Sequence, residues 1–593
     1  MDTNKLKRFA TEARNILKRG VAAKLMSLGF DANGHFDESE LPVKIQGGSI
    51  FRGQPQTEAF YHRWMSLYRH VREKGLKEVY EEAAYTWFNR FVAIRILQKN
   101  GLVEPVLDFV DVARTPYIVD AARMGHHPQM SSAEEEQLRT LLADVAAVTP
   151  QFALLITAYC HNNPIIYKCF GGIADYTELL LPNDILAENG FIDTLNHTEF
   201  ITDEDFASPE LIGWLYQFYI SEKKDDVFAA FKKGKKAEAE DIPAATQIFT
   251  PNWIVKYMVQ NTIGRIYLDN NPYEEDIQKN WKYLVDQPEK TPEDKILHYD
   301  DLKELKFGDL ACGSGHILNE GFDILYDLYI LEGYSRREAI ENIFRYNLTG
   351  IDIDTRAKQL AQFALLLKAC QKDNSFADAH IMPRVLDMPN VDRYTWRDLN
   401  GHMSCALKMK GADEVAYREL DECFNLMKDA QCLGSIMKMT ISASTRVFIQ
   451  ECIVKQNQKP QFEESFTDLF KGFELILALT ENYSTLVMNP PYMGNGNMND
   501  TLSSYVKRYY SEGKADLCTA FMLMQSNRTC QDGYYANIVP PSWMFLSTFE
   551  GLRYKLVNTQ SITSLLHLSR GVFGADFGSV SCVILTSAAK KAL

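Results

Sequence analysis

The pattern of apolar and polar positions divides the chain near residue 245. Before that point, apolar residues recur at helical spacing, as in residues 4–28, 78–97 and 132–148, and runs typical of strands are few. We therefore expect residues 1–245 to form a large α-helical N-terminal domain. The basic flank of residues 4–28 is more typical of a solvated face than of a DNA contact.

After residue 245, short apolar runs alternate with helical patterns, which favours an α/β, Rossmann-like sheet over residues 246–593. The runs expected to form strands end near residues 309, 352, 387, 488, 540, 568 and 586. The last two are expected to pair as an antiparallel hairpin around residues 571–574. Residues 390–480 are longer than a sheet crossover needs and are expected to form a helical insertion. The polar residues 495–515 predict a mobile loop over the site.

The most informative stretch is Asn489-Pro490-Pro491-Tyr492, which follows the apolar run Thr485–Met488. Two prolines end a strand, because neither can donate to a sheet ladder and each fixes its own φ. The Asn489 amide oxygen and the Pro490 carbonyl then stand on a stiff corner, where they can accept both N–H bonds of an exocyclic amino group. Tyr492 offers a flat face for an extruded base. A proline-terminated strand and turn without chemistry is the alternative.

Acidic residues end three of the other predicted strands. Asp309 precedes a turn that contains Gly313 and Gly315, and these glycines allow a tight turn and close approach to a ligand. Asp352 ends the second strand, where doubly wound folds bind ribose hydroxyls, and Asp387 ends the third. An acid at the start of the glycine turn suits a ligand with an ammonium group better than a pyrophosphate. Together these residues predict an adenosine-type cofactor.

Composition and charge narrow the class of protein. The 593 residues are 46% hydrophobic, and the 11 cysteines include no C-x-x-C pair. This favours reduced thiols in the cytoplasm over a disulfide framework or a metal site. No apolar run approaches the ~18 residues of a membrane span. The net charge of −15 argues against a protein that coats nucleic acid. Lysines cluster between residues 223 and 236, as a solvated linker or as a phosphate-facing loop.

Four motifs in chain order resemble amino-group DNA methyltransferases of the gamma arrangement, and the chain is similar to the PglX family of adenine-specific methyltransferases from BREX phage-defence systems. The motifs are F-T-P, D-x-A-C-G-S-G, G-I-D-I-D and N-P-P-Y. The resemblance implies a methyltransferase that uses S-adenosylmethionine as cofactor and double-stranded DNA as substrate, with other BREX proteins as partners and no metal. The residues implied to bind the cofactor are Phe249, Thr250, Pro251, Asp309, Ala311, Gly313, Gly315, Asp352 and Asp387. Those implied to act on the target amine are Asn489, Pro490, Pro491 and Tyr492, with Phe573 or Phe577 on the other face of the base.

The family also carries a target-recognition region after the catalytic sheet. Nothing in the sequence corresponds to it. Either the chain is a fragment that lacks this domain, which we expect, or a partner provides the recognition. Two other functions stay open from the sequence: the methyltransferase component of a restriction-modification system, and a cofactor-binding interaction module that is inactive without recognition elements. The N-P-P-Y motif alone does not choose between N6 of adenine and N4 of cytosine.

Overall fold

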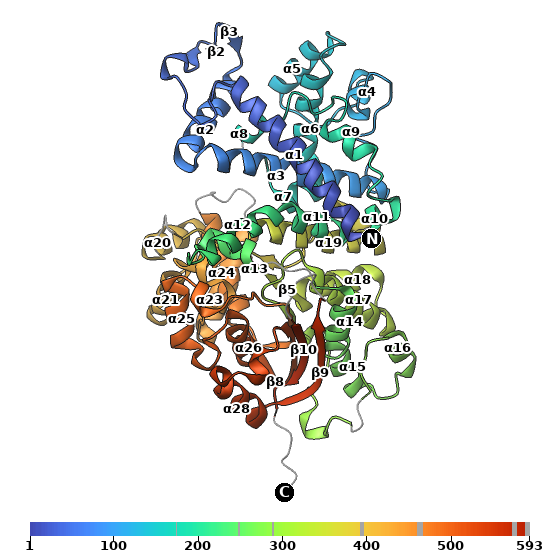
Figure 1. The fold of residues 1–593 in the computed structure, drawn as a ribbon, viewed down its shortest axis with the longest axis vertical. Coiled ribbons are helices and arrows are strands. Elements are labelled where there is room, and N and C mark those ends of the chain that lie inside the picture. Colours follow the sequence, from blue (N-terminus) through green and yellow to red (C-terminus); the bar gives the residue numbers. More distant parts are fainter. Residues whose placement is uncertain are drawn as a thin grey trace. The chain divides into compact units, whose positions relative to one another are not determined.

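The computed structural model describes residues 1–173, 175–246, 250–286, 290–391, 396–458, 466–571 and 578–587 (Figure 1). Within this part the chain forms two compact units. Unit 1 comprises residues 1–219 and 366–380, and unit 2 comprises residues 220–365 and 381–593. The division at residue 219 lies upstream of the boundary near 245 that the hydrophobic pattern suggests. None of the described helices is both long and apolar enough to cross a membrane.

Unit 1 is mainly helical, as the pattern predicts. Its helices are α1 Thr3–Ser27, α2 Glu58–Lys74, α3 Leu76–Lys99, α4 Tyr117–Arg123, α5 Ser132–Leu142, α6 Val148–Asn162, α7 Pro164–Phe170, α8 Asp175–Glu178, α9 Phe191–Asn196, α10 Asp203–Ala207 and α11 Leu211–Tyr219. The C-terminal half of α3 is buried all round and forms the centre of the unit. The helix α1 buries only one stripe, which includes Leu6, Phe9 and Leu17.

Two features of unit 1 differ from the sequence predictions. The single helix expected over residues 132–148 is wrong, because α5 ends at Leu142 and α6 begins at Val148. An antiparallel sheet of β1 Val43–Ile45, β2 Gly48–Phe51 and β3 Gln54–Gln56 was not predicted. Its strands are only three or four residues long, and every residue of β1 is exposed, so any apolar alternation is too short to predict a strand.

Unit 2 is built on a seven-stranded sheet with the order β6-β5-β4-β7-β8-β10-β9. The strands are β4 Phe307–Asp309, β5 Leu348–Ile351, β6 Val385–Leu386, β7 Tyr483–Met488, β8 Thr529–Val539, β9 Ser561–Arg570 and β10 Gly578–Leu585. β4 to β8 pair in parallel, whereas β10 is antiparallel to both β8 and β9. The α/β fold and the C-terminal antiparallel pair are therefore confirmed. The turn expected at residues 571–574 lies almost wholly outside the described residues.

Helices cover the sheet of unit 2 on both sides. Figure 1 shows α14 Asn252–Gln260, α15 Ile263–Asn270 and α17 His316–Leu331 on one side of the strands and α24 Thr467–Leu479, α26 Leu517–Arg528 and α28 Glu550–Thr559 on the other. The remaining helices are α12 Ser221–Lys232, α13 Ile242–Thr246, α16 Glu275–Asn280, α18 Arg336–Asn342, α19 Thr355–Lys372, α20 Trp396–Leu407, α21 Glu414–Met427, α22 Ala430–Leu433, α23 Ala443–Asn457, α25 Asp500–Tyr509 and α27 Ser542–Phe545. α20 to α24 lie within residues 390–480, for which the sequence analysis expects a helical insertion.

The loop predicted over residues 495–515 is largely wrong. Residues 500–509 form α25, which Asn499 caps by accepting from the Leu502 backbone N–H, and which buries Leu502 and Val506 against unit 2. Polar residues dominate the segment, but these two apolar side chains, one helical turn apart, are enough to fix it.

At the far end of the strand order, β9 pairs on one side only among the described strands. Its side chains are mostly part-exposed, and Ile562 and Leu565 are 38% and 40% exposed.

Candidate active site

The predicted site residues of unit 2 meet at one end of the sheet. β4 lies between β5 and β7, so the chain turns to one side after β4 and returns on the other side with β7. In open α/β sheets such a switch point opens a crevice at the carboxyl ends of the strands, where ligands bind. Asp309 ends β4, Asp352 follows β5, Asp387 follows β6 and Asn489 follows β7. The structure thus brings together four groups that are far apart in sequence.

The turn after β4 depends on two glycines for different reasons. Gly315 has φ +85°, and a Cβ added there would stand 2.8 Å from Cβ of Ala361 in α19, so no side chain fits between turn and helix. Gly313 has φ +53°, and no heavy atom lies within 4 Å of its added Cβ. The main chain at Gly313 is therefore open to close approach by a ligand. Within the turn, the Ala311 backbone N–H donates to Asp309 Oδ1 at 3.2 Å.

The carboxyl groups at the ends of β4 and β5 are close enough to affect each other. Asp309 is 1% exposed, and burial, with the charge of Asp352, holds its pKa well above the usual range. Asp352 accepts from the Gly313 N–H at 2.7 Å and from the Asp354 N–H at 2.9 Å. Burial nevertheless raises the pKa of Asp352 to about 7. Both carboxylates would gain from a ligand that brings a cation or hydroxyl donors.

Asp387, the third predicted acid, has a different environment. It is 4% exposed, and its Oδ1 lies 3.6 Å from Nζ of Lys358 in α19. This carboxylate already has a cation beside it, so it is better suited to accept hydrogen bonds than to bind a second cation.

The amide of Asn489 is held from two sides. Its Nδ2 donates to Thr250 Oγ1 at 2.9 Å, and the Tyr492 hydroxyl donates to its Oδ1 at 2.8 Å. That hydroxyl also lies 2.8 Å from the carbonyl oxygen of Ile538 in β8. Thr250 is 4% exposed, and Pro251 precedes the first turn of α14. The F-T-P and N-P-P-Y motifs, 239 positions apart, are thus joined at their polar side chains.

These contacts add to the roles that the resemblance implies. Tyr492 was expected only to stack on a base, and Thr250 only to contact the cofactor, whereas both side chains also orient Asn489. Pro490 is buried, and Pro491 is partly exposed. Phe249, Phe573 and Phe577 lie outside the described residues.

Asp516 is a residue of the site that the sequence analysis missed. It caps α26 by accepting from the Cys518 N–H at 3.1 Å, and the same Oδ1 accepts from the Met493 N–H at 3.2 Å. Backbone bonds from Leu517 to Met493 and from Asn495 to Ala515 continue this pairing. The segment after Tyr492 is therefore fastened to the start of α26. An aspartate directly before a helix is an N-cap pattern, but its second partner is not readable from sequence.

The insertion reaches the site through Gly434–Ile436, a single 3-10 turn. Ser435 Oγ donates to the Leu310 carbonyl in the turn after β4, and a Cβ on Gly434 would stand 3.7 Å from Ile353, which follows β5. From the other side, the Arg528 guanidinium donates to the carbonyls of Ser435 at 2.8 Å and Met437 at 2.6 Å. The insertion thus supports both acidic strand ends, which no local sequence pattern predicts.

Comparison with known proteins agrees with this geometry. Residues 346–573 match the family model of the Eco57I restriction-modification methylase. Over 98% of its length the chain is 31% identical to the adenine-specific methyltransferase BrxX of Escherichia coli O9:H4 (strain HS). It is also 31% identical, over 98% of its length, to the adenine-specific methyltransferase PglX of Lacticaseibacillus casei (strain Zhang). The chain is a relative of these methyltransferases. The resemblance inferred from the four motifs is therefore confirmed.

The chain spans about half the length of these curated relatives, since the matches cover 50% of each.

Proposed function

We propose that the chain transfers the methyl group of S-adenosylmethionine to N6 of an adenine flipped out of duplex DNA. The observation that carries the proposal is the position of Asn489. Its amide is fixed by Thr250 and Tyr492 at the carboxyl end of β7, beside the open glycine turn of β4. An acceptor for an amino group thus stands next to a candidate cofactor site.

The residues at the ends of β4 and β5 fit the cofactor. The main chain at Gly313 is open, and the buried carboxylate of Asp309 matches an ammonium group. Asp352 would accept from the ribose hydroxyls, and Asp387 from the adenine of the cofactor. Phe249, Thr250 and Pro251 would adjoin the methionine end. When bound, S-adenosylmethionine supplies an electrophilic methyl group on a sulfonium.

Catalysis at the corner would come from orientation and polarisation. A carboxamide oxygen has two lone pairs, so Asn489 Oδ1 can accept from Tyr492 and from the target amine together. The Pro490 carbonyl would accept the second N–H of the amine. Both bonds draw the nitrogen lone pair out of conjugation with the ring and aim it at the methyl group. The proton leaves the nitrogen after transfer, so no strong base is needed.

Three choices in this proposal rest on the relatives. BrxX and PglX carry the name adenine-specific methyltransferase, which favours N6 of adenine over N4 of cytosine. The resemblance to PglX further suggests that the chain acts in a BREX phage-defence system, with other defence proteins as partners. The Eco57I family keeps a restriction-modification setting as the second candidate.

Methyl transfer and cofactor binding must be measured separately to test the proposal. The chain is incubated with S-adenosylmethionine labelled in its methyl group and with unmethylated genomic DNA, and the product is digested and analysed for N6-methyladenine. Asn489→Ala should abolish transfer while calorimetry shows nearly unchanged cofactor affinity. Cofactor binding by the wild-type chain without transfer to any DNA would favour the interaction module instead. Label in N4-methylcytosine would overturn the choice of base.

A further inference from the structure

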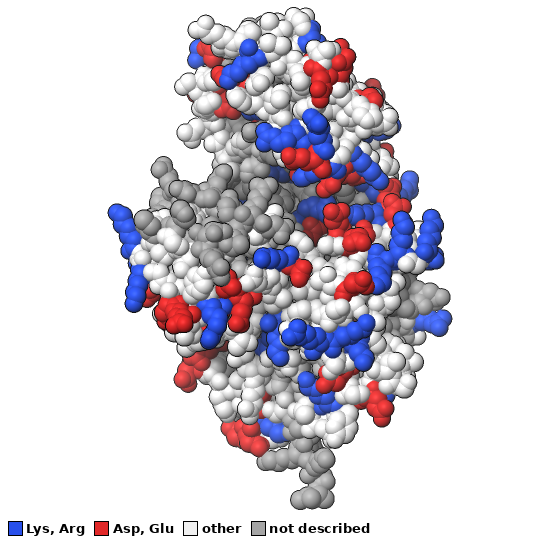
Figure 2. Space-filling view, turned by 90° about the vertical axis from the view of Figure 1, so that its left-hand side faces the viewer, with Lys and Arg blue, Asp and Glu red and all other residues white. Residues whose placement is uncertain are grey.

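Two basic segments of the chain have no role in the proposed reaction. One is the polar face of α1 in unit 1, and the other is the turn Lys232–Lys236 in unit 2, called the lysine turn below. On the face drawn in Figure 2, basic and acidic side chains are interspersed, in keeping with the net charge of −15. A contact with a polyanion therefore has to be local, and the surroundings of each segment decide between them.

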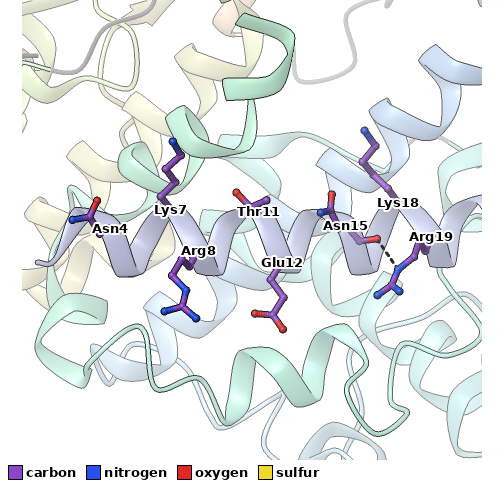
Figure 3. Close-up of a pocket in the computed structure, with 8 residues that line it drawn as sticks. All are labelled: Asn4, Lys7, Arg8, Thr11, Glu12, Asn15, Lys18 and Arg19. Carbon is purple, nitrogen blue, oxygen red and sulfur yellow. Dashed lines mark hydrogen bonds between the residues drawn. The ribbon is translucent and has the colours of Figure 1, made fainter. Parts of the chain in front are cut away.

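The polar face of α1 lines an open pocket of about 980 Å³ (Figure 3), but most of its cations are engaged within unit 1. The guanidinium of Arg8 lies over the Phe200 ring at 4.9 Å. Lys18 pairs with Glu81, and Arg19 Nε donates to the Asn15 carbonyl at 3.3 Å. Glu12 adds a negative charge to the same face. These contacts are those of a solvated structural helix.

The lysines of the lysine turn, in contrast, are exposed and have few described partners. α12 ends at Lys232, and Gly234, with φ +77°, reverses the chain so that the Lys235 N–H donates to the Ala230 carbonyl. Lys232, Lys233, Lys235 and Lys236 are thereby presented together, and all four are exposed. Only Lys236 has a described ion pair, with Asp500 at 2.6 Å. Exposed ion pairs of this kind contribute only about 0–1 kcal/mol to stability, so a phosphate can replace Asp500 as the partner of Lys236.

The C-terminal end of the lysine turn is bonded to the segment that follows Tyr492. The Ala237 N–H donates to the Asn497 carbonyl at 2.9 Å, and Ala237 is fully buried. Asn497 follows Tyr492 by five residues, which span at most roughly 18 Å even when extended. Phosphates on one DNA strand are spaced about 3.4 Å along the axis, so Asn497, to which the C-terminal end of the lysine turn is bonded, lies within about five such spacings of Tyr492. Further on, the same segment reaches Thr250, which holds Asn489.

We infer that the lysine turn contacts the phosphates of the DNA strand beside the flipped base. This inference rests on the proposed function and adds a part of the interface that the motifs do not include. The contact is independent of sequence, because ammonium groups on phosphates position the duplex without reading base edges.

The test changes the four lysines to glutamine together and follows duplex binding by fluorescence anisotropy at several salt concentrations. Each lost phosphate contact should lower the slope of log affinity against log salt by about 0.9, so the quadruple variant should lose about 2 to 4 in slope. Its affinity at low salt should fall by roughly tenfold or more. Calorimetry with S-adenosylmethionine should show unchanged cofactor affinity, which confirms that unit 2 is folded.

Two control variants distinguish an effect of the lysine turn on DNA binding from an effect of the overall net charge. Replacing Lys5, Lys7, Arg8 and Arg19 of α1 with glutamine removes the same charge and should leave the slope nearly unchanged. Replacing the four lysines of the turn with arginine should preserve it. An unchanged slope in the glutamine variant of the turn, or an equal loss in the α1 variant, overturns the inference. Adenine methylation by the wild-type chain, measured in parallel, shows independently whether the proposed function stands.

Discussion

At the residue scale, the contribution of the Tyr492 hydroxyl can be measured separately from that of the Tyr492 ring. The hydroxyl lies 2.8 Å from both Asn489 Oδ1 and the Ile538 carbonyl oxygen, so it links the Asn489 amide to the neighbouring strand β8. Tyr492→Phe keeps the stacking face and removes only this coupling. A lost hydrogen bond of about 1–2 kcal/mol lowers a rate by about 5- to 30-fold.

We therefore expect Tyr492→Phe to lower kcat for methyl transfer by that factor and to leave the affinity for S-adenosylmethionine unchanged. Steady-state kinetics with calorimetry checks both. The matched control is Tyr509→Phe, since Tyr509 is exposed on α25. A fall in kcat as large as that of Asn489→Ala would mean that the hydroxyl does more than orient the amide.

Asp352 gives cofactor binding a pH dependence. Because its pKa is raised to about 7, the carboxyl group is mostly protonated at pH 6 and mostly ionised at pH 8. Only the ionised form accepts from both ribose hydroxyls, so affinity for S-adenosylmethionine should rise by about tenfold between these values. The neighbouring Asp309, whose pKa is also raised, would steepen the rise.

Calorimetry from pH 5.5 to 8.5 measures this dependence. Asp352→Asn should bind more weakly and with a flatter pH profile. The opposite slope, with tighter binding in acid, would contradict the assignment of Asp352 to the hydroxyl groups. Folding stability carries the reverse sign: a carboxyl group with a raised folded pKa stabilises the fold below its unfolded pKa, and that contribution is lost as pH rises towards 7.

At the element scale, the helical insertion supports the turn that we propose as the cofactor site. Ser435 is 3% exposed, and its hydroxyl donates to the Leu310 carbonyl. The Arg528 guanidinium donates to the carbonyl of Ser435 itself and so fixes the backbone of Gly434–Ile436. We expect Ser435→Ala to weaken S-adenosylmethionine binding several-fold and to lower the free energy of unfolding by about 1–2 kcal/mol, because a buried carbonyl loses its donor.

Denaturant titration and calorimetry on Ser435→Ala test this, with Ser444→Ala as the control, since Ser444 is exposed on α23. Ser435→Thr keeps a hydroxyl and should recover part of the affinity. Stability that falls without any change in cofactor affinity would limit the insertion to a structural role.

An element could be predicted from the sequence where a local pattern of residues determines it. β4, β5 and β7 were predicted well because each is a buried strand that leads directly into a motif residue. α25 and the sheet β1–β3 were not, because each has only a few apolar residues and polar residues dominate both segments. The links within the site were beyond sequence reasoning, since Ser435 and Leu310 are 125 positions apart and Arg528 and Ser435 are 93 apart. Side chains that meet through the fold leave no pattern along the chain.

At the scale of the whole molecule, the two units should respond differently to the cofactor. All described cofactor-binding candidates belong to unit 2. A ligand at 100 times its Kd stabilises its site by about 2.7 kcal/mol, which for a unit of this size raises Tm by about 4 °C. We expect calorimetric scans to show an upward shift in one transition only, and Asp352→Ala to abolish it. Equal shifts of every transition would show that the two units unfold as one.

The last strand in the order has a consequence for handling the protein in solution. β9 presents ten residues with one unpaired edge among the described strands, and apolar side chains such as Ile562 and Leu565 are partly exposed on it. Long open edges can template the addition of further strands from other molecules, and the two register shifts between β9 and β10 are irregularities that oppose such pairing. The net charge of −15 opposes such association, because chains of like charge repel each other. Concentrated samples of this chain should therefore self-associate more readily as salt screens that charge.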